Sequence, residues 1–351
     1  MSTLKVDTLQ HRDGTEYILS ERNKLINGDF SVAQRGTSIT SATDITNNDT
    51  NHTLDRWQLF SDGNDIVDVT QETTTVPTNG LYAIALDVET ANKKFGIAQK
   101  IEQKNCVDLI GQEVTLSFKA KVSATTNLDN VKCAIIAWDG TADSLTDDMI
   151  SAWGSEGTDP TLATNYTYEN TPANLNLTTS YATYTTTATI DTSGAKNVVV
   201  FIWSDVTTTS AGEFLYVTDV QLEKGPSNSV FERKSFGEQY SACQRYFMAI
   251  GGDDEFQQIA LGSVNSSTNA RVGFSSPCHL FKVPAITVSA NGDFILNTGG
   301  SEHDPTGFAN HRSSRDFVFF DVTIPSSTTF NPARLHADNN LNARLFVDAE
   351  I

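Results

Sequence analysis

Residues 113–122 read EVTLSFKAKV, and this alternation of apolar and polar side chains decides the class of fold. Every second residue from Val114 onward is apolar, and the residues between are threonine, serine and lysine. A period of two predicts a β-strand with one face in a core and the other in water. Residues 197–203, NVVVFIW, are apolar at nearly every position, so this second strand must be covered on both faces. In a two-layer sandwich, a loop, a neighbouring subunit or a bound ligand has to supply the second cover.

The composition of the chain extends this expectation to the whole molecule. Of 351 residues, 38% are hydrophobic and 19% are charged, and stretches rich in threonine, serine and asparagine separate short apolar runs. This pattern favours strands and turns over helices, and the length suits two modest domains. We therefore predict an all-β protein.

One helix is expected in the second half of the chain. Phe236, Tyr240, Cys243 and Phe247 follow one another at intervals of four, three and four, which is the spacing of one helical stripe. This short helix would link the first β part to a second. Apolar runs bounded by turn residues then predict a C-terminal β-sandwich, at residues 256–261, 285–289, 316–324 and 343–351.

Several phrases of the sequence carry a resemblance. NGDF at residues 27–30 and TDVQLE at residues 218–223 look like the first and last strands of one sandwich. With LDRWQ at 54–58 and GEQYSACQRYF at 237–247, they resemble the carbohydrate-binding-module-like jelly rolls of tail-fibre and receptor-binding proteins of marine bacteriophages. The ending FVDAEI resembles the terminal strand of the same proteins.

The resemblance implies a division of the chain into three parts. Residues 1–24 would be a virion-docking segment, residues 25–232 the jelly roll, and residues 233–351 the linking helix and the C-terminal β-sandwich. In the first part, Leu4, Val6 and Leu9 alternate with polar residues, which is too little to bury a core. The segment would dock onto other phage tail or capsid proteins; alternatively, it is an edge strand of its own sandwich.

The net charge, the apolar runs and the cysteines limit the partners and the compartment that we expect for this protein. The formal net charge of -19 argues against nucleic acid as a partner, because such binding depends on clustered lysine and arginine. No apolar run is long enough for a secretory signal or a membrane span, so we expect no membrane insertion. The four cysteines are scattered without a CxxC pair, so we expect reduced thiols in a virion protein assembled in the host cytoplasm.

Aromatic residues supply candidate glycan contacts. Trp138 and Trp203 each end the second apolar face of a strand, and as neighbours they would form a patch on which a sugar ring stacks. The long loop 139–174 adds Trp153, Tyr166 and Tyr168 as further candidate glycan-binding residues. The alternative is that these rings pack under that loop or against another subunit.

The resemblance also implies a structural calcium ion where the first and last strands meet. Asp29 and Asp219 would supply carboxylate oxygens, the ligands that calcium prefers. In the alternative interpretation, Asp29 makes an Asx turn and Asp219 pairs with Arg56 or a lysine.

The sequence contains no phosphate-binding loop, no HExxH and no GxSxG motif, so we expect no catalysis. The resemblance implies a homotrimeric virion structural protein, a tail fibre or related appendage, that binds host-surface polysaccharide reversibly. Two alternatives stay open. The first is a purely architectural decoration or adaptor protein of the capsid or tail, and the second is a glycan-degrading tailspike.

Overall fold

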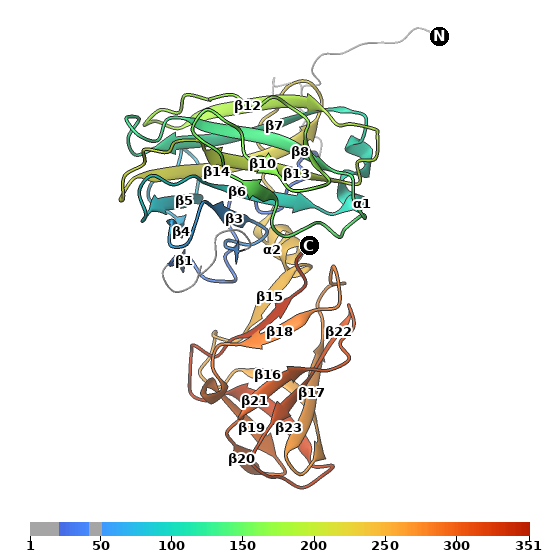
Figure 1. Ribbon diagram of the computed structural model, residues 1–351. Helices are drawn as coiled ribbons and strands as arrows, with labels where there is room; N and C mark the ends of the chain where they lie inside the picture. Colours follow the sequence, from blue (N-terminus) through green and yellow to red (C-terminus); the bar gives the residue numbers. More distant parts are fainter. Residues whose placement is uncertain (1–20, 42–50) are drawn as a thin grey trace, which may run out of the picture.

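The computed structural model describes residues 21–41 and 51–351, and these form two β-sandwiches joined by a short helix (Figure 1). The prediction of an all-β protein with a linking helix is confirmed. Most of the predicted docking segment, residues 1–20, lies outside the described residues. Residues 21–24 belong to the first sandwich, because the Lys24 amide donates to the Leu222 carbonyl at 2.9 Å.

Two six-stranded antiparallel sheets build the first sandwich. The sheet that we call the β7 sheet has the order β1 (Ser38–Ile39), β4 (Val67–Glu72), β5 (Ala83–Val88), β14 (Phe214–Lys224), β7 (Glu113–Val122), β12 (Ala182–Thr189). The β13 sheet has the order β11 (Tyr166–Tyr168), β8 (Val131–Trp138), β13 (Asn197–Ser204), β6 (Phe95–Ile101), β3 (Gln58–Ser61), β2 (Asn51–His52). From β5 to β8, consecutive strands alternate between the two sheets, as in a jelly roll.

Short elements complete the first sandwich. A helical turn made of α1 (Gln103–Cys106) and η1 (Val107–Leu109) connects β6 to β7. A separate two-stranded ribbon of β9 (Ile150–Ala152) and β10 (Thr161–Leu162) lies in the long connection after β8.

The two strands singled out from the sequence occupy the expected environments. On β7, the alternate apolar residues from Val114 to Val122 are buried in the main core between the two sheets. On β13, Val198, Val200 and Ile202 face this same core. Val199 and Phe201 belong to a second apolar cluster on the other side of the β13 sheet. The double cover predicted for this strand is therefore confirmed.

The opening phrase is a turn, which corrects the expectation of a first strand. Asn27 and Phe30 have left-handed backbone angles, φ 58° and φ 55°, which a strand does not accept. The turn packs on β14, where the Val220 amide donates to the Gly28 carbonyl at 2.8 Å. At this place β14 has a bulge between Thr218 and Gln221, and Asp219 is left-handed at φ 51°. The two phrases do meet, but as a turn against a bulged strand.

The linking helix α2 (Phe236–Gln244) begins at a capping box. The Ser235 side chain accepts from the Glu238 amide, and the Glu238 side chain accepts from the Ser235 amide, so two terminal donors are satisfied. In Figure 1 this helix lies between the two sandwiches.

The C-terminal sandwich packs a three-stranded sheet against a seven-stranded one. The smaller has the order β15 (Phe247–Ile250), β24 (Leu345–Asp348), β18 (Ala285–Val288). The larger has the order β20 (Ser301–His303), β19 (Phe294–Thr298), β23 (Pro332–Ala337), β16 (Gln258–Ser266), β17 (Asn269–Ser275), β22 (Phe317–Thr323), β21 (Gly307–Asn310). One turn of 3-10 helix, η2 (Asn291–Asp293), precedes β19.

Buried charges fasten the C-terminal end of the chain to the first sandwich. Arg56 of the first sandwich pairs with Glu350, and both side chains are nearly inaccessible. The Arg56 guanidinium also lies over the Tyr246 ring, 3.6 Å from its centroid. Arg245 pairs with Glu102 at 2.7 Å across the same junction. Within the described part of the chain, no helix is both long and apolar enough to cross a bilayer.

Candidate functional site

Trp138 and Trp203 lie on neighbouring strands and share one face of the β13 sheet, but at opposite ends of it. The antiparallel register sets Trp138 opposite Asn197 and Trp203 opposite Lys132. Because the strands run in opposite directions, their last residues are separated by the length of the pair, about 20 Å. The predicted single tryptophan patch is therefore wrong.

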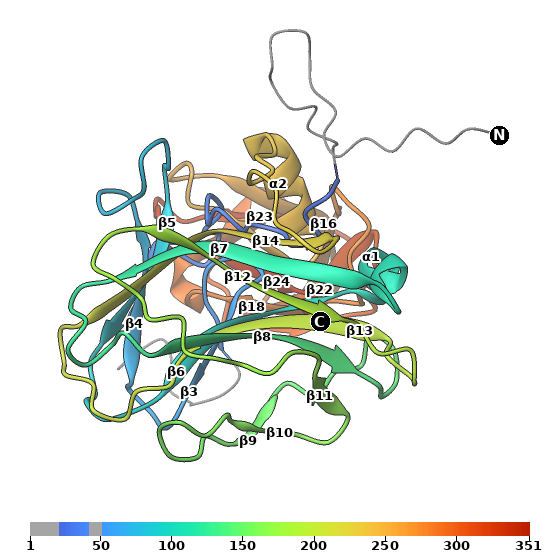
Figure 2. The ribbon, with the colours of Figure 1, turned by 90° about the horizontal axis from the view of Figure 1, so that it is seen from above.

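Both tryptophans are also covered. Trp203 is 0% exposed and Trp138 is 3% exposed. The Trp138 ring contacts Tyr166 with the centroids 4.7 Å apart, and Trp203 stacks on Phe201 at the same centroid distance. The loop 139–174 folds back over this face with β9, β10 and β11, which Figure 2 shows beyond β8. Both tryptophans therefore pack under the loop 139–174, which is the alternative that the sequence left open.

The aromatic residues of the loop hold it in place. The Tyr166 hydroxyl donates to the Thr146 carbonyl at 2.6 Å, and the Tyr168 hydroxyl donates to the Pro160 carbonyl at 2.8 Å. Burial raises the pKa of both phenols, so they remain neutral donors. Trp153 is buried against Phe201. The predicted aromatic residues thus build a core. Tyr168 is half-buried at its edge, and the four buried rings present no face on which a sugar could stack: Trp138, Trp153, Tyr166 and Trp203.

A buried ammonium group completes the anchoring of the loop. Lys94 and Asp205 are both fully buried and form an ion pair. The Lys94 ammonium also donates to the carbonyls of Ser155 and Thr158, at 2.8 and 3.2 Å. Lys132 lies 3.0 Å from the second oxygen of Asp205. Asp159 pairs with Lys132 at 2.8 Å, so two carboxylates compensate the two cations, and a rigid polar network fixes the loop.

Asp29 and Asp219 converge, as the resemblance implies, but on cations of the chain itself. Arg233 lies 3.0 Å from one Asp219 oxygen and 3.9 Å from an Asp29 oxygen. Lys119 donates to the other Asp219 oxygen at 2.8 Å. Asp29 also accepts from the Ser31 amide at 3.4 Å, which is the bond of the predicted Asx turn, and from the Ser31 hydroxyl at 2.9 Å. Asp219 thus pairs with a lysine and Arg233, and not with Arg56.

These residues do not fit a calcium ion. A calcium site needs six to eight oxygen ligands around one point, whereas here a guanidinium lies between the two carboxylates. Among the residues that the structure describes, no group of three or more His, Cys, Asp or Glu side chains is placed to hold a metal.

An open polar groove lies on the outer face of the β7 sheet, over β14, β7 and β12. It consists of two adjoining cavities of about 570 and 530 Å³, which share Thr78, Lys119 and Thr183 in their walls. We call it the outer-face groove. Its lining is drawn from four segments and one residue of the β14 bulge: residues 75–79, 117–121, 179–183 and 228–233, and Asp219.

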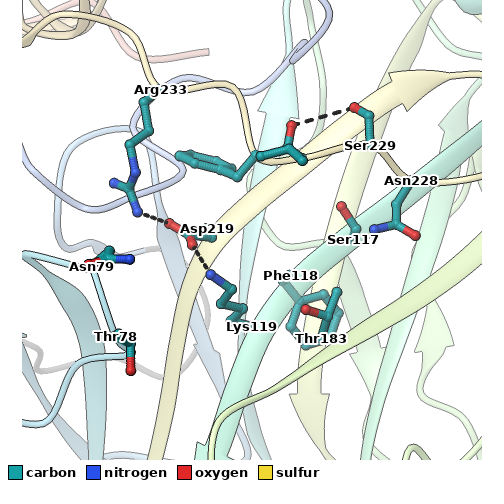
Figure 3. Close-up of a pocket in the computed structure, with 12 residues that line it drawn as sticks. Thr78, Asn79, Ser117, Phe118, Lys119, Thr183, Asp219, Asn228, Ser229 and Arg233 are labelled. Atoms are coloured by element: carbon teal, nitrogen blue, oxygen red, sulfur yellow. Dashed lines mark hydrogen bonds and ion pairs between the residues drawn. The ribbon is translucent and has the colours of Figure 1, made fainter. Parts of the chain in front are cut away.

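The chain builds this groove from the outward-facing residues of β7 and the loops beside it. Ser117, Lys119 and Lys121 alternate with the core residues of β7, so all three lie on the outer face. Across from Lys119, at the paired position on β12, is Thr183. The β14 bulge turns Asp219 toward the groove, where Figure 3 shows Arg233 and Lys119 pointing at it from two sides.

Six of the twelve residues that line the first cavity carry hydroxyl or amide groups, and two, Phe118 and Phe231, carry aromatic rings. The hydrogen-bonding residues labelled in Figure 3 include Asn79, Ser117 and Asn228. Such groups both donate and accept, as the hydroxyls of a sugar do. The arrangement can therefore hold a polyhydroxylated ligand by hydrogen bonds and ring contacts.

Tyr181, in the wall of the second cavity, joins two of the segments around the groove. The Tyr181 hydroxyl donates to the Thr75 carbonyl at 2.8 Å, and this bond joins the segment before β12 to the loop between β4 and β5. Burial is the largest cause that raises the pKa of Tyr181. The Lys121 ammonium lies 5.5 Å from the Tyr216 ring centroid and 6.0 Å from that of Tyr181.

Only one wall of this groove has a local signal in the sequence, the polar residues of β7. Alternation alone marks a solvated face, so the pattern assigns Ser117, Lys119 and Lys121 to water and does not indicate a site. What makes the face a groove is the packing of distant segments, such as residues 75–79 and 228–233, around it. No local pattern encodes that convergence.

Comparison with known proteins does not assign the chain to a family. No family model matches the chain, and no curated protein sequence matches it. Among solved structures, it is similar to tailspike protein 4 of bacteriophage CBA120, with a TM-score of 0.35 and 16% identity. That match covers 60% of this chain but only 23% of the tailspike chain.

Two carbohydrate-binding modules are similar at the same level. A CBM4 module matches with a TM-score of 0.31 and 16% identity, over 57% of this chain and 98% of the module. A xylan-binding CBM22 module of Paenibacillus barcinonensis matches with a TM-score of 0.29 and 13% identity, over 54% of this chain and 94% of the module. These scores are too low to establish a common fold, so they carry no inference on the function of this chain.

Proposed function

We propose that this protein binds host-surface polysaccharide in the outer-face groove, without catalysis, as part of a virion. The observation that carries the glycan-binding proposal is the groove itself, which has two adjoining cavities of about 570 and 530 Å³ lined by hydroxyl and amide groups. Two adjoining open cavities suit a polymer that passes across the sheet more than a small ligand enclosed in a single pocket.

A glycan microarray with two matched variants tests this proposal. Thr183→Trp places an indole at the wall that both cavities share, on an exposed position of β12 where the ring does not disturb the core. Thr187→Trp makes the same change four residues further along the same exposed face, outside the groove lining. We expect Thr183→Trp to weaken binding by about tenfold or more, while Thr187→Trp binds like the unmodified protein.

Retained binding in Thr183→Trp would place the site elsewhere. Failure of the unmodified protein to bind any glycan on the array would contradict the function itself.

Non-catalytic binding is supported by the acidic groups of the groove. A glycosidase uses two carboxyl groups on either side of the scissile bond. Among the described residues that line the groove, Asp219 is the one carboxylate, and it is held by Lys119 and Arg233. Incubation with the bound polysaccharide should therefore release no new reducing ends. Such release would support the tailspike alternative.

The virion setting, as a homotrimeric tail fibre or related appendage, rests on the sequence resemblance. The four cysteines are unpaired, which is consistent with assembly in a reducing cytoplasm. Three copies would present three grooves, so a weak single site would gain strength through multivalency. A sedimentation profile of the purified chain tests the trimer, and a cryo-EM reconstruction of the particle tests its place on the virion.

An architectural role is the second candidate, favoured by one feature of the C-terminal sandwich. On the outer face of its larger sheet, Leu261 is 66% exposed and Phe317 is 37% exposed. These side chains suit contact with a neighbouring virion protein. Copies bound flat on the particle, together with no glycan binding, would favour this role.

A further inference from the structure

The outer-face groove differs in charge from the rest of the molecule. The charged residues that line it are Lys119, Lys121 and Arg233 against Asp219, three cations and one anion, which gives the lining a net charge of +2. The whole chain carries -19. An excess of positive charge in one open groove of so acidic a protein marks a place suited to an anionic ligand.

Lys121 is the cation with the least compensation. No carboxylate among the described residues forms an ion pair with it, and its ammonium lies near the rings of Tyr181 and Tyr216. Lys121 is only partly buried, so its donors remain accessible from the groove. The tyrosine faces position this charge without neutralising it.

Lys119 and Arg233 share a single carboxylate. Asp219 accepts from Lys119 at 2.8 Å through one oxygen and from Arg233 at 3.0 Å through the other. One negative charge thus offsets two positive ones, and the side chains of Lys119 and Arg233 are still 35% and 44% exposed. Both cations keep donors free for a second acceptor.

The carboxylates beside the groove have partners of their own. Glu223 accepts from the amide and hydroxyl of Ser229, and Glu232 accepts from the amides of Glu21 and Asn23. Asp29 is engaged by Ser31 and lies 3.9 Å from Arg233. Burial alone would raise the pKa of Glu72, but hydrogen bonds from the Thr74 hydroxyl and from the amides of Thr74 and Thr75 lower it. None of these carboxylates lines the groove.

We propose that the outer-face groove selects anionic polysaccharides, with a sugar carboxylate or sulfate group bound by Lys121 and the sugar hydroxyls bound by the neutral lining. This inference rests on the proposed function, since it names the class of glycan for the same groove. Charged hydrogen bonds are stronger than neutral ones, so an acidic sugar gains over a neutral sugar of the same shape.

Polygalacturonate and its fully methyl-esterified form test the inference, because they share a backbone and differ in charge. By isothermal titration calorimetry, we expect the acidic polymer to bind about tenfold more tightly than the ester. Rising sodium chloride should reduce this preference, because salt screens exposed charges. Dextran sulfate measured against dextran distinguishes a sulfate-selective groove from a carboxylate-selective one, and either preference supports an anionic ligand.

Lys121→Gln supplies the decisive variant, and Lys224→Gln is its control. Lys224 is exposed at the end of β14 and lines neither cavity, so its replacement changes the net charge equally. Lys121→Gln should bring the two forms of the polymer within about twofold of each other, while Lys224→Gln keeps the preference. Thermal unfolding of each variant confirms that it is folded.

Equal binding of acidic and neutral polymers by the unmodified protein would overturn the inference and leave the proposed function standing. An unchanged preference in Lys121→Gln would also overturn it. Failure to bind any charged or neutral glycan of the panel would reject both.

Discussion

At the scale of single residues, Lys94 anchors the long loop 139–174 to the first sandwich. Its ammonium is fully buried and contacts carbonyl oxygens of the loop as well as Asp205. A charge in such a place is stable only while its partners stay around it. The loop over the tryptophans is therefore held by a specific network and by apolar contact together.

Replacing Lys94 by methionine should destabilise the protein strongly. The variant leaves Asp205 buried with one cation fewer, and breaking a buried pair in this way costs about 3 to 5 kcal/mol. Urea unfolding measures the loss. Lys93→Met is the matched control, because Lys93 is 39% exposed in a surface pair with Asp62, and its removal should cost less than about 1 kcal/mol. Equal stability of the two variants would show that the network does not hold the loop.

At the scale of elements, the contact between the NGDF turn and the β14 bulge fixes where the chain enters the sandwich. Gly28 lies so close to Val220 that a β-carbon would overlap the Val220 carbonyl oxygen. Asn23 binds the same segment, since its side-chain amide donates to the Val220 carbonyl at 3.1 Å. The bulge also directs Asp219 toward the groove, so this contact joins the fold to the candidate site.

Gly28→Ala should therefore destabilise the first sandwich by about 1 to 3 kcal/mol, the usual range for overpacking. Chemical denaturation of the variant measures this. Gly237→Ala serves as the comparison, because a β-carbon there meets no atom within 4 Å and the position lies in α2. That change should be neutral or slightly stabilising. A Gly28→Ala protein with unchanged stability would mean that the turn can shift away from β14.

The elements also show which features a sequence pattern can predict. The core and solvent faces of β7 and the double cover of β13 followed from side-chain periodicity, because burial imposes that period directly. The place of Trp203 relative to Trp138 did not follow, since register and strand direction depend on pairing between distant segments. For the same reason, the cation between Asp29 and Asp219 was missed. Arg233 comes from the segment after β14, which no local pattern brings to that point.

At the scale of the whole molecule, the two sandwiches share a buried electrostatic junction. His52, 3.7 Å from Glu350, is kept neutral mainly by burial, which lowers its pKa from 6.5 to about 3. Burial alone would raise the pKa of Glu350, but Arg56 and its other cationic neighbours lower it from 4.5 to about 2. Both groups bind protons less readily in the folded protein than in the unfolded chain.

Acid should therefore weaken the protein in a defined window. The contribution of His52 is complete above pH 6.5 and is lost as the pH falls toward about 3. The contribution of Glu350 is complete above pH 4.5 and is lost toward about 2. Calorimetry from pH 7 to pH 3 should show a falling unfolding temperature, with a shallower fall between pH 6.5 and 4.5 in His52→Gln. An identical profile in that variant would exclude His52 as a source of the acid sensitivity.

The central claim is that glycan binds in the outer-face groove, and hydrogen exchange measured by mass spectrometry with and without a bound polysaccharide tests it most directly. We predict slower exchange in residues 75–79, 117–121, 179–183 and 228–233, which line the groove. Protection confined to the loop 139–174, above the buried tryptophans, would contradict the claim.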